Sequence, residues 1–150
     1  MREELKEKSE INFHHVLPVQ IRWNDADVFG HVNNSVYFQF YDTAKTNYIE
    51  TVCPDVEWTK SAIVMVHVDA EFIMPILSTK KIAIKSAILK IGNKSFTLEQ
   101  EAVDTDTNEV YCRCRSIMVY MDRTIHSSAP IPQSWVECIT KYESDNLNKA

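Results

Sequence analysis

The segment from residue 22 to residue 37 gathers side chains that could take part in acid–base or acyl-transfer chemistry. Between residues 25 and 34 it holds two carboxylates, a glycine, a histidine and two asparagines, namely Asp25, Asp27, Gly30, His31, Asn33 and Asn34. A carboxylate can act as a general base on water, or it can attack a carbonyl carbon itself as a nucleophile. Either role needs a nearby group that stabilises negative charge on the oxygen of the attacked carbonyl.

The predicted elements on either side of this segment supply such a group. Residues 16–23 have the Val, Ile and Trp content of a strand, and the polar cluster 24–27 then begins a loop. Residues 34–52 contain no Gly or Pro, and Asn33 or Asn34 can cap their start while Pro54 ends them. Apolar residues recur there at spacings of three and four, which predicts one long helix: Tyr37, Phe40, Tyr41, Ala44, Tyr48 and Val52.

A helix N-terminus carries backbone N–H groups that have no partner within the helix, together with a favourable dipole. Negative charge that develops beside it is therefore stabilised. We predict that the loop holds a carboxylate next to such an amide, which is the arrangement of an oxyanion hole. One preorganised donor of this kind typically contributes about 10²–10³ in rate.

Beyond residue 60 the apolar residues recur with a period of two. Val66, Val68, Ala70 and Phe72 share one face of a predicted strand, and the polar residues between them share the other, wet face. Residues 82–91, 95–103 and 110–121 are three further strands, separated by the turn sequences 92–93 and 104–108. Such short connections join antiparallel neighbours. The fold class is therefore α+β, with a curved antiparallel sheet of about five strands around one buried helix.

Length and composition limit the possible functions. The chain has 150 residues with 45% hydrophobic content, which predicts one domain over 1–150, with a polar leader at 1–15 and a polar tail at 143–150. The charged N-terminus has no apolar run, so we expect a cytosolic protein without a membrane span. A net charge of −5, from 21 acidic and 16 basic residues, argues against nucleic-acid binding.

The cysteines and the acidic loop give no sign of a metal site. Cys53, Cys112, Cys114 and Cys138 lack the paired spacing of a zinc site and are predicted to be free thiols. The pair Asp25 and Asp27 superficially resembles a calcium loop, but Phe29 and Val36 stand where ligands should be. We expect no metal and no other cofactor.

The string Asp-x-Asp-x-x-Gly-His-Val-Asn-Asn-x-x-Tyr at 25–37, followed by a long helix and long strands, resembles the hotdog-fold thioesterases of the 4-hydroxybenzoyl-CoA thioesterase group. The similarity extends from about residue 16 to residue 132. It implies hydrolysis of an acyl-CoA thioester, with Asp27 as the base or nucleophile and the helix amide at Asn34 as the polarising group. In this motif Gly30, His31, Val32, Asn33 and Tyr37 are the expected substrate-binding residues.

The remaining side chains of the segment have plainer interpretations. Asp25 is expected to support the loop through turn hydrogen bonds rather than to react. A histidine beside a helix start, such as His31, more often makes a structural hydrogen bond or contacts a ligand than acts as a base.

The resemblance also implies partners. Hotdog subunits pair edge to edge into a continuous sheet, so we expect a homodimer, often doubled into a homotetramer, in which each site borrows residues from the partner. The acyl-CoA substrate is the other expected partner, and four basic residues are candidates to bind its phosphates: Lys90, Lys94, Arg113 and Arg115.

Three alternatives stay open. An acyl-carrier-protein thioesterase would use the same chemistry on a protein-borne substrate. A hotdog hydratase needs a histidine base in a string that this chain lacks. A non-catalytic acyl-binding module would have little use for Asp27, because a carboxylate beside an anionic ligand opposes binding.

Overall fold

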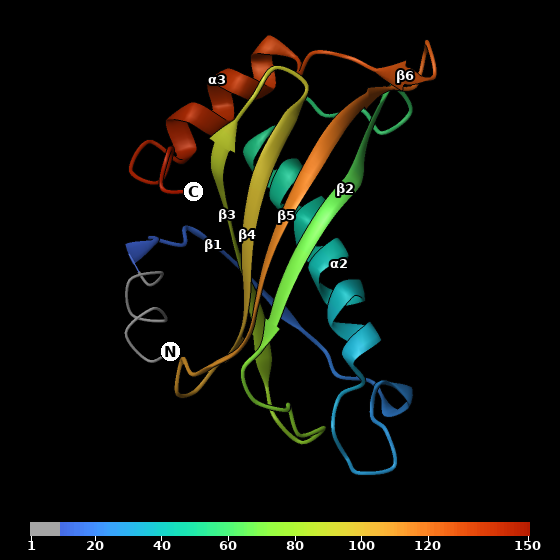
Figure 1. The fold of residues 1–150 in the computed structure, drawn as a ribbon, viewed down its shortest axis with the longest axis vertical. Coiled ribbons are helices and arrows are strands. Elements are labelled where there is room, and N and C mark those ends of the chain that lie inside the picture. The colour runs from blue at the N-terminus through green and yellow to red at the C-terminus, as the bar shows by residue number, and fades with distance from the viewer. Residues whose placement is uncertain (1–9) are drawn as a thin grey trace.

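The computed structural model describes residues 10–150, which form an antiparallel sheet and two α-helices (Figure 1). The strands are β1 (His15–Val19), β2 (Ser61–Phe72), β3 (Ile82–Ile91), β4 (Ser95–Asp104), β5 (Val110–Asp122) and the short β6 (Ser127–Ser128). They follow the order β1-β3-β4-β5-β2, with β6 paired to the end of β5. Every pairing is antiparallel, so the predicted α+β class is confirmed.

The long helix α2 (Asn34–Val52) crosses one face of the sheet, as Figure 1 shows. Its bounds are those predicted, because Asn33 caps the start and the chain reaches Pro54 just after the end. The Asn33 side chain accepts a hydrogen bond of 3.1 Å from the Ser35 amide. The apolar stripe is buried against the sheet and consists of Val36, Tyr37, Phe40, Tyr41, Ala44, Tyr48, Ile49 and Val52.

The strand predictions differ from the structure mainly at β1. Strand β3 has the predicted bounds, and β4 and β5 each run one residue further than predicted. Strand β1 ends at Val19 instead of Trp23, because residues 23–25 form a 3-10 turn, η2 (Trp23–Asp25). Asp25 closes this turn by accepting a hydrogen bond from the Arg22 amide.

Strand β2 is an edge strand with one polar and one apolar face. A bulge between Met65 and His67 changes the register against β5, after which Val68, Ala70 and Phe72 lie opposite the inward-facing Ser116, Cys114 and Cys112. Val66, which is also predicted on this face, is the unpaired residue of the bulge and is 59% exposed, so the remaining three residues form the apolar face on the helix side of the sheet. It is incompletely covered in the single chain, because Val68 is 37% and Phe72 44% exposed.

The two predicted polar ends are only partly solvated. Residues 1–9 of the leader lie outside the described residues, and His15 is already the first residue of β1. The expected tail begins instead with a buried residue: Glu143 and Asn146 are both fully inaccessible. They follow an unpredicted helix, α3 (Gln133–Tyr142), which buries Trp135 and Ile139.

The predicted free thiols are confirmed, with Cys53, Cys112 and Cys114 buried and Cys138 half-buried. Burial raises the pKa of the Cys53 thiol to about 12, so this side chain is an unreactive part of the core. Among residues 10–150 neither α2 nor α3 is long and apolar enough to cross a membrane.

Candidate active site

The loop between η2 and α2 is held on both sides by backbone hydrogen bonds. Within the loop, Ala26 and Val32 form an antiparallel bridge. The Val32 amide donates to the Ile76 carbonyl at 2.8 Å, and the Ser78 amide donates to the Gly30 carbonyl at 2.9 Å. The loop is thereby fixed between the start of α2 and the segment that follows β2.

Asp27 is exposed, and only one of its two carboxylate oxygens is used by the loop. Oδ1 accepts hydrogen bonds from the Phe29 amide at 2.9 Å and the His31 amide at 3.1 Å. Oδ2 makes no hydrogen bond to any of the described residues, so it is available to water or to a bound ligand. The carboxylate is therefore oriented by two amides while keeping a free acceptor.

Asp27 borders an open cleft of about 770 Å³. The other lining residues include Ile21, Arg22, Trp23, Gly30 and Ser78. A second cleft of about 790 Å³ lies between β1 and the outer side of α2. We place the candidate site in the first cleft, because the second contains neither Asp27 nor any other residue of the loop 26–33.

Asn34, the predicted polarising residue, is the first residue of α2. The two following amides are satisfied, because Ser35 donates to the Asn33 side chain and Val36 donates to the Asn33 carbonyl at 2.9 Å. The Asn34 amide itself has no hydrogen-bond acceptor among the described residues. It is the kind of unpartnered donor that the sequence predicts at this helix start.

The other predicted binding residues fall into three groups: those at the cleft, those in the core, and the helix cap. Gly30 borders the cleft with φ of +76° and open space where a Cβ would lie, and the half-buried His31 follows it. Val32 and Tyr37 belong to the core, with exposures of 3% and 2%. Asn33 is committed to capping the helix. In the single chain, the structure therefore brings Asp27, Gly30 and His31 together and places Val32 and Tyr37 beneath them.

Sequence reasoning missed two contributions to this cleft. Ser78 comes from a separate segment and reaches the loop through its amide, which no local sequence pattern reveals. Trp23, Val28 and Phe29 are 94%, 94% and 78% exposed, although all three are apolar. The sequence alone could have indicated them, because three large apolar residues in an otherwise polar loop are unusual unless another surface covers them.

Asp25 behaves as a structural clamp. It is 2% exposed and accepts hydrogen bonds from the Arg22 amide at 2.7 Å and the Arg22 guanidinium at 3.1 Å. Its carbonyl accepts from the Asn33 amide at 2.8 Å, which ties η2 to the cap of α2. Burial acts to raise the pKa of Asp25, but the hydrogen bonds and charge of Arg22 outweigh it and hold the pKa below its usual value.

Replacing Asp25 with asparagine should lower the free energy of unfolding by about 1–3 kcal/mol, because a buried charge-assisted pair is lost. A carboxyl group whose pKa is lowered on folding stabilises the protein above its unfolded pKa, and this contribution disappears as the pH falls through the folded pKa. The deficit measured by urea denaturation should therefore be full at neutral pH and should shrink below about pH 4.

Asp42→Asn is the matched control, because Asp42 also pairs with a cation three residues away but its side chain is 63% exposed. That change should alter the free energy of unfolding by less than about 0.5 kcal/mol. Equal stability losses in the two variants would show that Asp25 is no more than a surface charge.

The four candidate phosphate ligands lie away from the cleft within one chain. Arg113 pairs with Glu101 at 3.4 Å and Arg115 pairs with Glu99 at 2.6 Å, on the face of the sheet opposite α2. Lys90 and Lys94 flank the β3–β4 turn, at the opposite end of the sheet from the residue 26–33 loop (Figure 1). Arg22 is the one basic residue among those that line the Asp27 cleft.

A comparison with protein-family models finds one matching family. The family model of the thioesterase-like superfamily matches residues 21–139, which include the loop, the helix α2 and the four long strands β2 to β5. That range covers most of the chain and contains every predicted site residue.

Solved structures share the fold. The PA5185 protein of Pseudomonas aeruginosa aligns with a TM-score of 0.80 and 23% identity, over 92% of this chain and 94% of its own. A Thermus thermophilus thioesterase, complexed with coenzyme A and Zn, gives 0.75 and 23% over 86% and 93%. A 1,4-dihydroxy-2-naphthoyl-CoA thioesterase from Synechocystis gives 0.71 and 18% over 83% and 94%. The architecture is therefore the hotdog fold.

Proposed function

The chain belongs to the thioesterase-like superfamily, and from that premise we propose that it hydrolyses an acyl-coenzyme A thioester to a free acid and coenzyme A. The observation that carries the proposal is the state of Asp27. Its carboxylate is oriented by two amides, keeps Oδ2 free and borders an open cleft just before the start of α2. No metal or redox cofactor is required, because a thioester is already activated toward acyl transfer.

Asp27 would act on the thioester in one of two ways. As a general base it takes a proton from water while the water oxygen attacks the carbonyl carbon, and the tetrahedral intermediate then breaks its C–S bond and releases the coenzyme A thiolate, which takes up a proton. As a nucleophile it attacks that carbon itself, forms a mixed anhydride and releases the thiolate, and water then hydrolyses the anhydride. In both routes the carbonyl oxygen gains negative charge, for which the unpartnered amide of Asn34 is the proposed donor.

Two of the similar structures support coenzyme A as the carrier of the acyl group. One was solved with coenzyme A bound, and the other is named for an aromatic acyl-CoA substrate. Arg22, whose side chain is 64% exposed and borders the cleft, is a cation that could meet an anionic part of such a substrate.

We also propose that the active unit is a homodimer formed along β2. This strand is twelve residues long and terminates the sheet order, so its outer edge can pair with a second strand. Its helix-side face presents Val68 and Phe72 without full cover, and Phe72 contacts Tyr37 of α2 with ring centroids 5.3 Å apart. A second subunit at this edge would cover that face and complete the cleft.

The direct test is to offer the protein a panel of short-chain, long-chain and aromatic acyl-CoA esters. The release of the free thiol measures hydrolysis of each ester. At least one ester should be cleaved with kcat/KM above about 10⁴ M⁻¹s⁻¹, which is the lower end of ordinary enzyme efficiency. The same acyl groups on an acyl carrier protein should be cleaved more slowly. Faster cleavage from the carrier protein would identify an acyl carrier protein, instead of coenzyme A, as the carrier of the acyl group. No cleavage from either carrier would contradict the proposed activity.

A further inference from the structure

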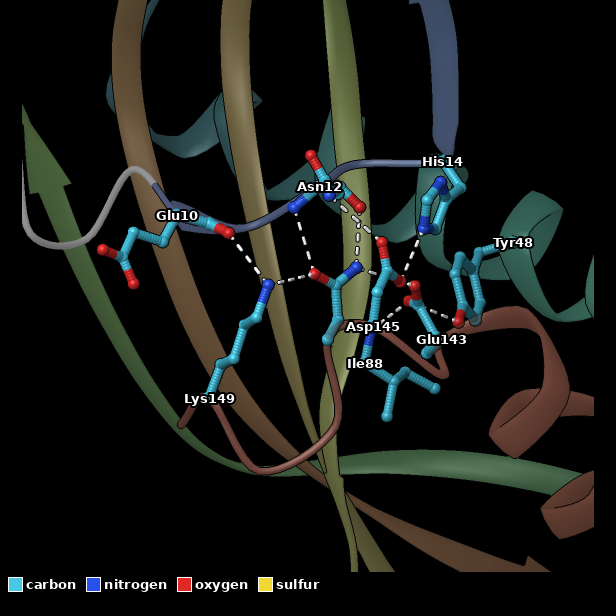
Figure 2. A network of polar contacts seen from close by, with 9 residues as sticks. Glu10, Asn12, His14, Tyr48, Ile88, Glu143, Asp145 and Lys149 are labelled. Carbon is cyan, nitrogen blue, oxygen red and sulfur yellow. Dashed lines mark hydrogen bonds and ion pairs between the residues drawn. The ribbon is translucent and has the colours of Figure 1, made fainter.

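The two ends of the described chain meet beside β3, at a distance from the Asp27 cleft. Figure 2 shows residues that precede β1 and residues that follow α3 joined in one polar network. The Asn12 amide donates to the Asn146 side chain at 3.0 Å, and the Asn146 amide group donates back to the Asn12 carbonyl. Tyr48, near the C-terminal end of α2, reaches the same network, so the proposed catalytic loop at the other end of the helix takes no part in it.

Three potential metal ligands of two chemical types converge in this network. They are the imidazole of His14 and the carboxylates of Glu143 and Asp145, and one ligand atom from each lies within 4.8 Å of the others. His14 Nε2 and Asp145 Oδ1 are 2.8 Å apart, which is close to the spacing of two ligands around one ion. Figure 2 shows all three side chains pointing toward one another.

We propose that His14, Glu143 and Asp145 form a binding site for a divalent transition-metal ion of the zinc, cobalt or nickel class. The ion would join the segment before β1 to the segment after α3. One imidazole and two carboxylates match the preferences of these ions, whereas calcium and magnesium favour sites made of oxygen ligands alone. Water would complete the coordination, because the His14 and Asp145 side chains are 38% and 39% exposed.

Glu143 provides the main reason to expect a cation here. It is fully buried, yet the three donors to its carboxylate among residues 10–150 are neutral: the Tyr48 hydroxyl at 2.9 Å, the Ile88 amide at 2.7 Å and the Asn146 amide group at 3.1 Å. A buried charge is costly unless an opposite charge compensates it.

Lys149, the lysine that Figure 2 labels in this network, does not provide that charge directly. Lys149 Nζ donates to the Asn146 side-chain oxygen at 3.2 Å and to the Glu10 carbonyl at 2.9 Å, and neither acceptor is the buried carboxylate. Asp145, which pairs with His14 at 2.8 Å, adds a second carboxylate to the same cluster. A metal ion would contact both carboxylates at once.

The surrounding donors also hold the ligands in place. Tyr48, Ile88 and Asn146 orient Glu143, and the Asn12 amide group donates to Asp145 Oδ2 at 3.1 Å. Hydrogen bonds of this kind from outside the coordination sphere orient ligands in established metal sites. The ligands would thus need little rearrangement to bind an ion.

The test uses the full chain without an affinity tag, after treatment with a chelator. Zn²⁺ should bind with a stoichiometry of one per chain in isothermal titration calorimetry, and at about 100-fold excess over Kd it should raise Tm by about 5–10 °C. Co²⁺ should give visible d–d absorption without the sulfur charge-transfer bands that binding by a cysteine would produce.

Three variants test whether His14 and Asp145 bind the metal ion. His14→Ala and Asp145→Asn should weaken Zn²⁺ binding at least tenfold while leaving the Tm of the metal-free protein nearly unchanged, because both side chains are partly exposed. His67→Ala is the matched control, since His67 and Asp69 form an exposed pair at 3.1 Å that lacks a third ligand, and it should bind Zn²⁺ as the wild type does. Wild-type affinity in His14→Ala, or no stoichiometric binding by the wild type, would overturn the proposal.

Discussion

Replacing Asp27 with asparagine should lower the rate of thioester hydrolysis by about 10²–10⁴-fold. An asparagine amide can still occupy the loop, but it can neither take a proton from water nor form an anhydride. The fold should persist, because Asp27 is exposed and an asparagine Oδ1 can still accept from the Phe29 and His31 amides. Hydrolysis rates, with far-UV circular dichroism and Tm to check folding, would measure both effects.

Asp55→Asn is a suitable control for this change. Asp55 is also an exposed carboxylate in a turn, but it follows the C-terminal end of α2 instead of preceding its start. Hydrolysis by this variant should match the wild type. If the Asp27 and Asp55 variants are equally active, Asp27 is neither base nor nucleophile, and the loop has only a structural role.

Replacing Val68 with aspartate should dissociate the proposed homodimer and abolish most of the activity. Val68 faces the helix side of β2, so a partner subunit at this edge would have to bury the new charge. The cost of burying an unpaired carboxylate should raise the dimer Kd by at least about 100-fold. Sedimentation or light scattering would report the mass, and hydrolysis assays across a range of protein concentrations would report the linked loss of rate.

Val64→Asp provides the comparison on the same strand. Val64 lies before the bulge, opposite the outward-facing Val119, and it is 45% exposed against 37% for Val68. An aspartate on the polar face should leave both the mass and the activity unchanged. Full activity in a monomeric Val68→Asp variant would show that one chain contains the complete site.

The main elements of the fold were predictable because each has a local cause. The spacing from Tyr37 to Val52, with an asparagine at one end and Pro54 after the other, specifies α2 without reference to the rest of the chain. The turns at 92–93 and 104–108 likewise set the bounds of β3, β4 and β5. These features depend on backbone conformation and burial within single segments.

The structure at the two ends of the chain was less predictable, because it depends on contacts between distant segments. Nothing in the sequence near Glu143 indicates that its carboxylate would meet Tyr48 and Ile88, which are 95 and 55 residues away. A polar composition therefore suggested a solvated tail. Strand β1 was overextended for a related reason, since Trp23 has strand propensity but the Asp25 turn redirects the chain.

The candidate site divides in the same way. The carboxylate of Asp27, the positive φ of Gly30 and the helix start at Asn34 all lie within one short segment, so its pattern locates them. Ser78 and the uncovered face of β2 enter through tertiary and proposed subunit contacts, which a linear pattern does not encode. The catalytic roles remain predictions until the Asp27 variant is measured.

The bulge near Met65 affects which face of the sheet each side chain of β2 occupies, so the number of residues in this strand matters as well as their types. Side chains in a strand alternate between faces, and Val66 is the extra residue, because Met65 lies opposite Met118 and His67 opposite Ile117. Losing Val66 would therefore restore a regular ladder with Val68 still opposite Ser116, whereas losing Asp69 would move the residues after it to the other face. In the second case Glu71 would take the helix-side position of Ala70, and a charged side chain would replace an apolar one there. Over evolutionary time this strand should accept many substitutions, but it should tolerate single-residue insertions or deletions at the bulge and few elsewhere.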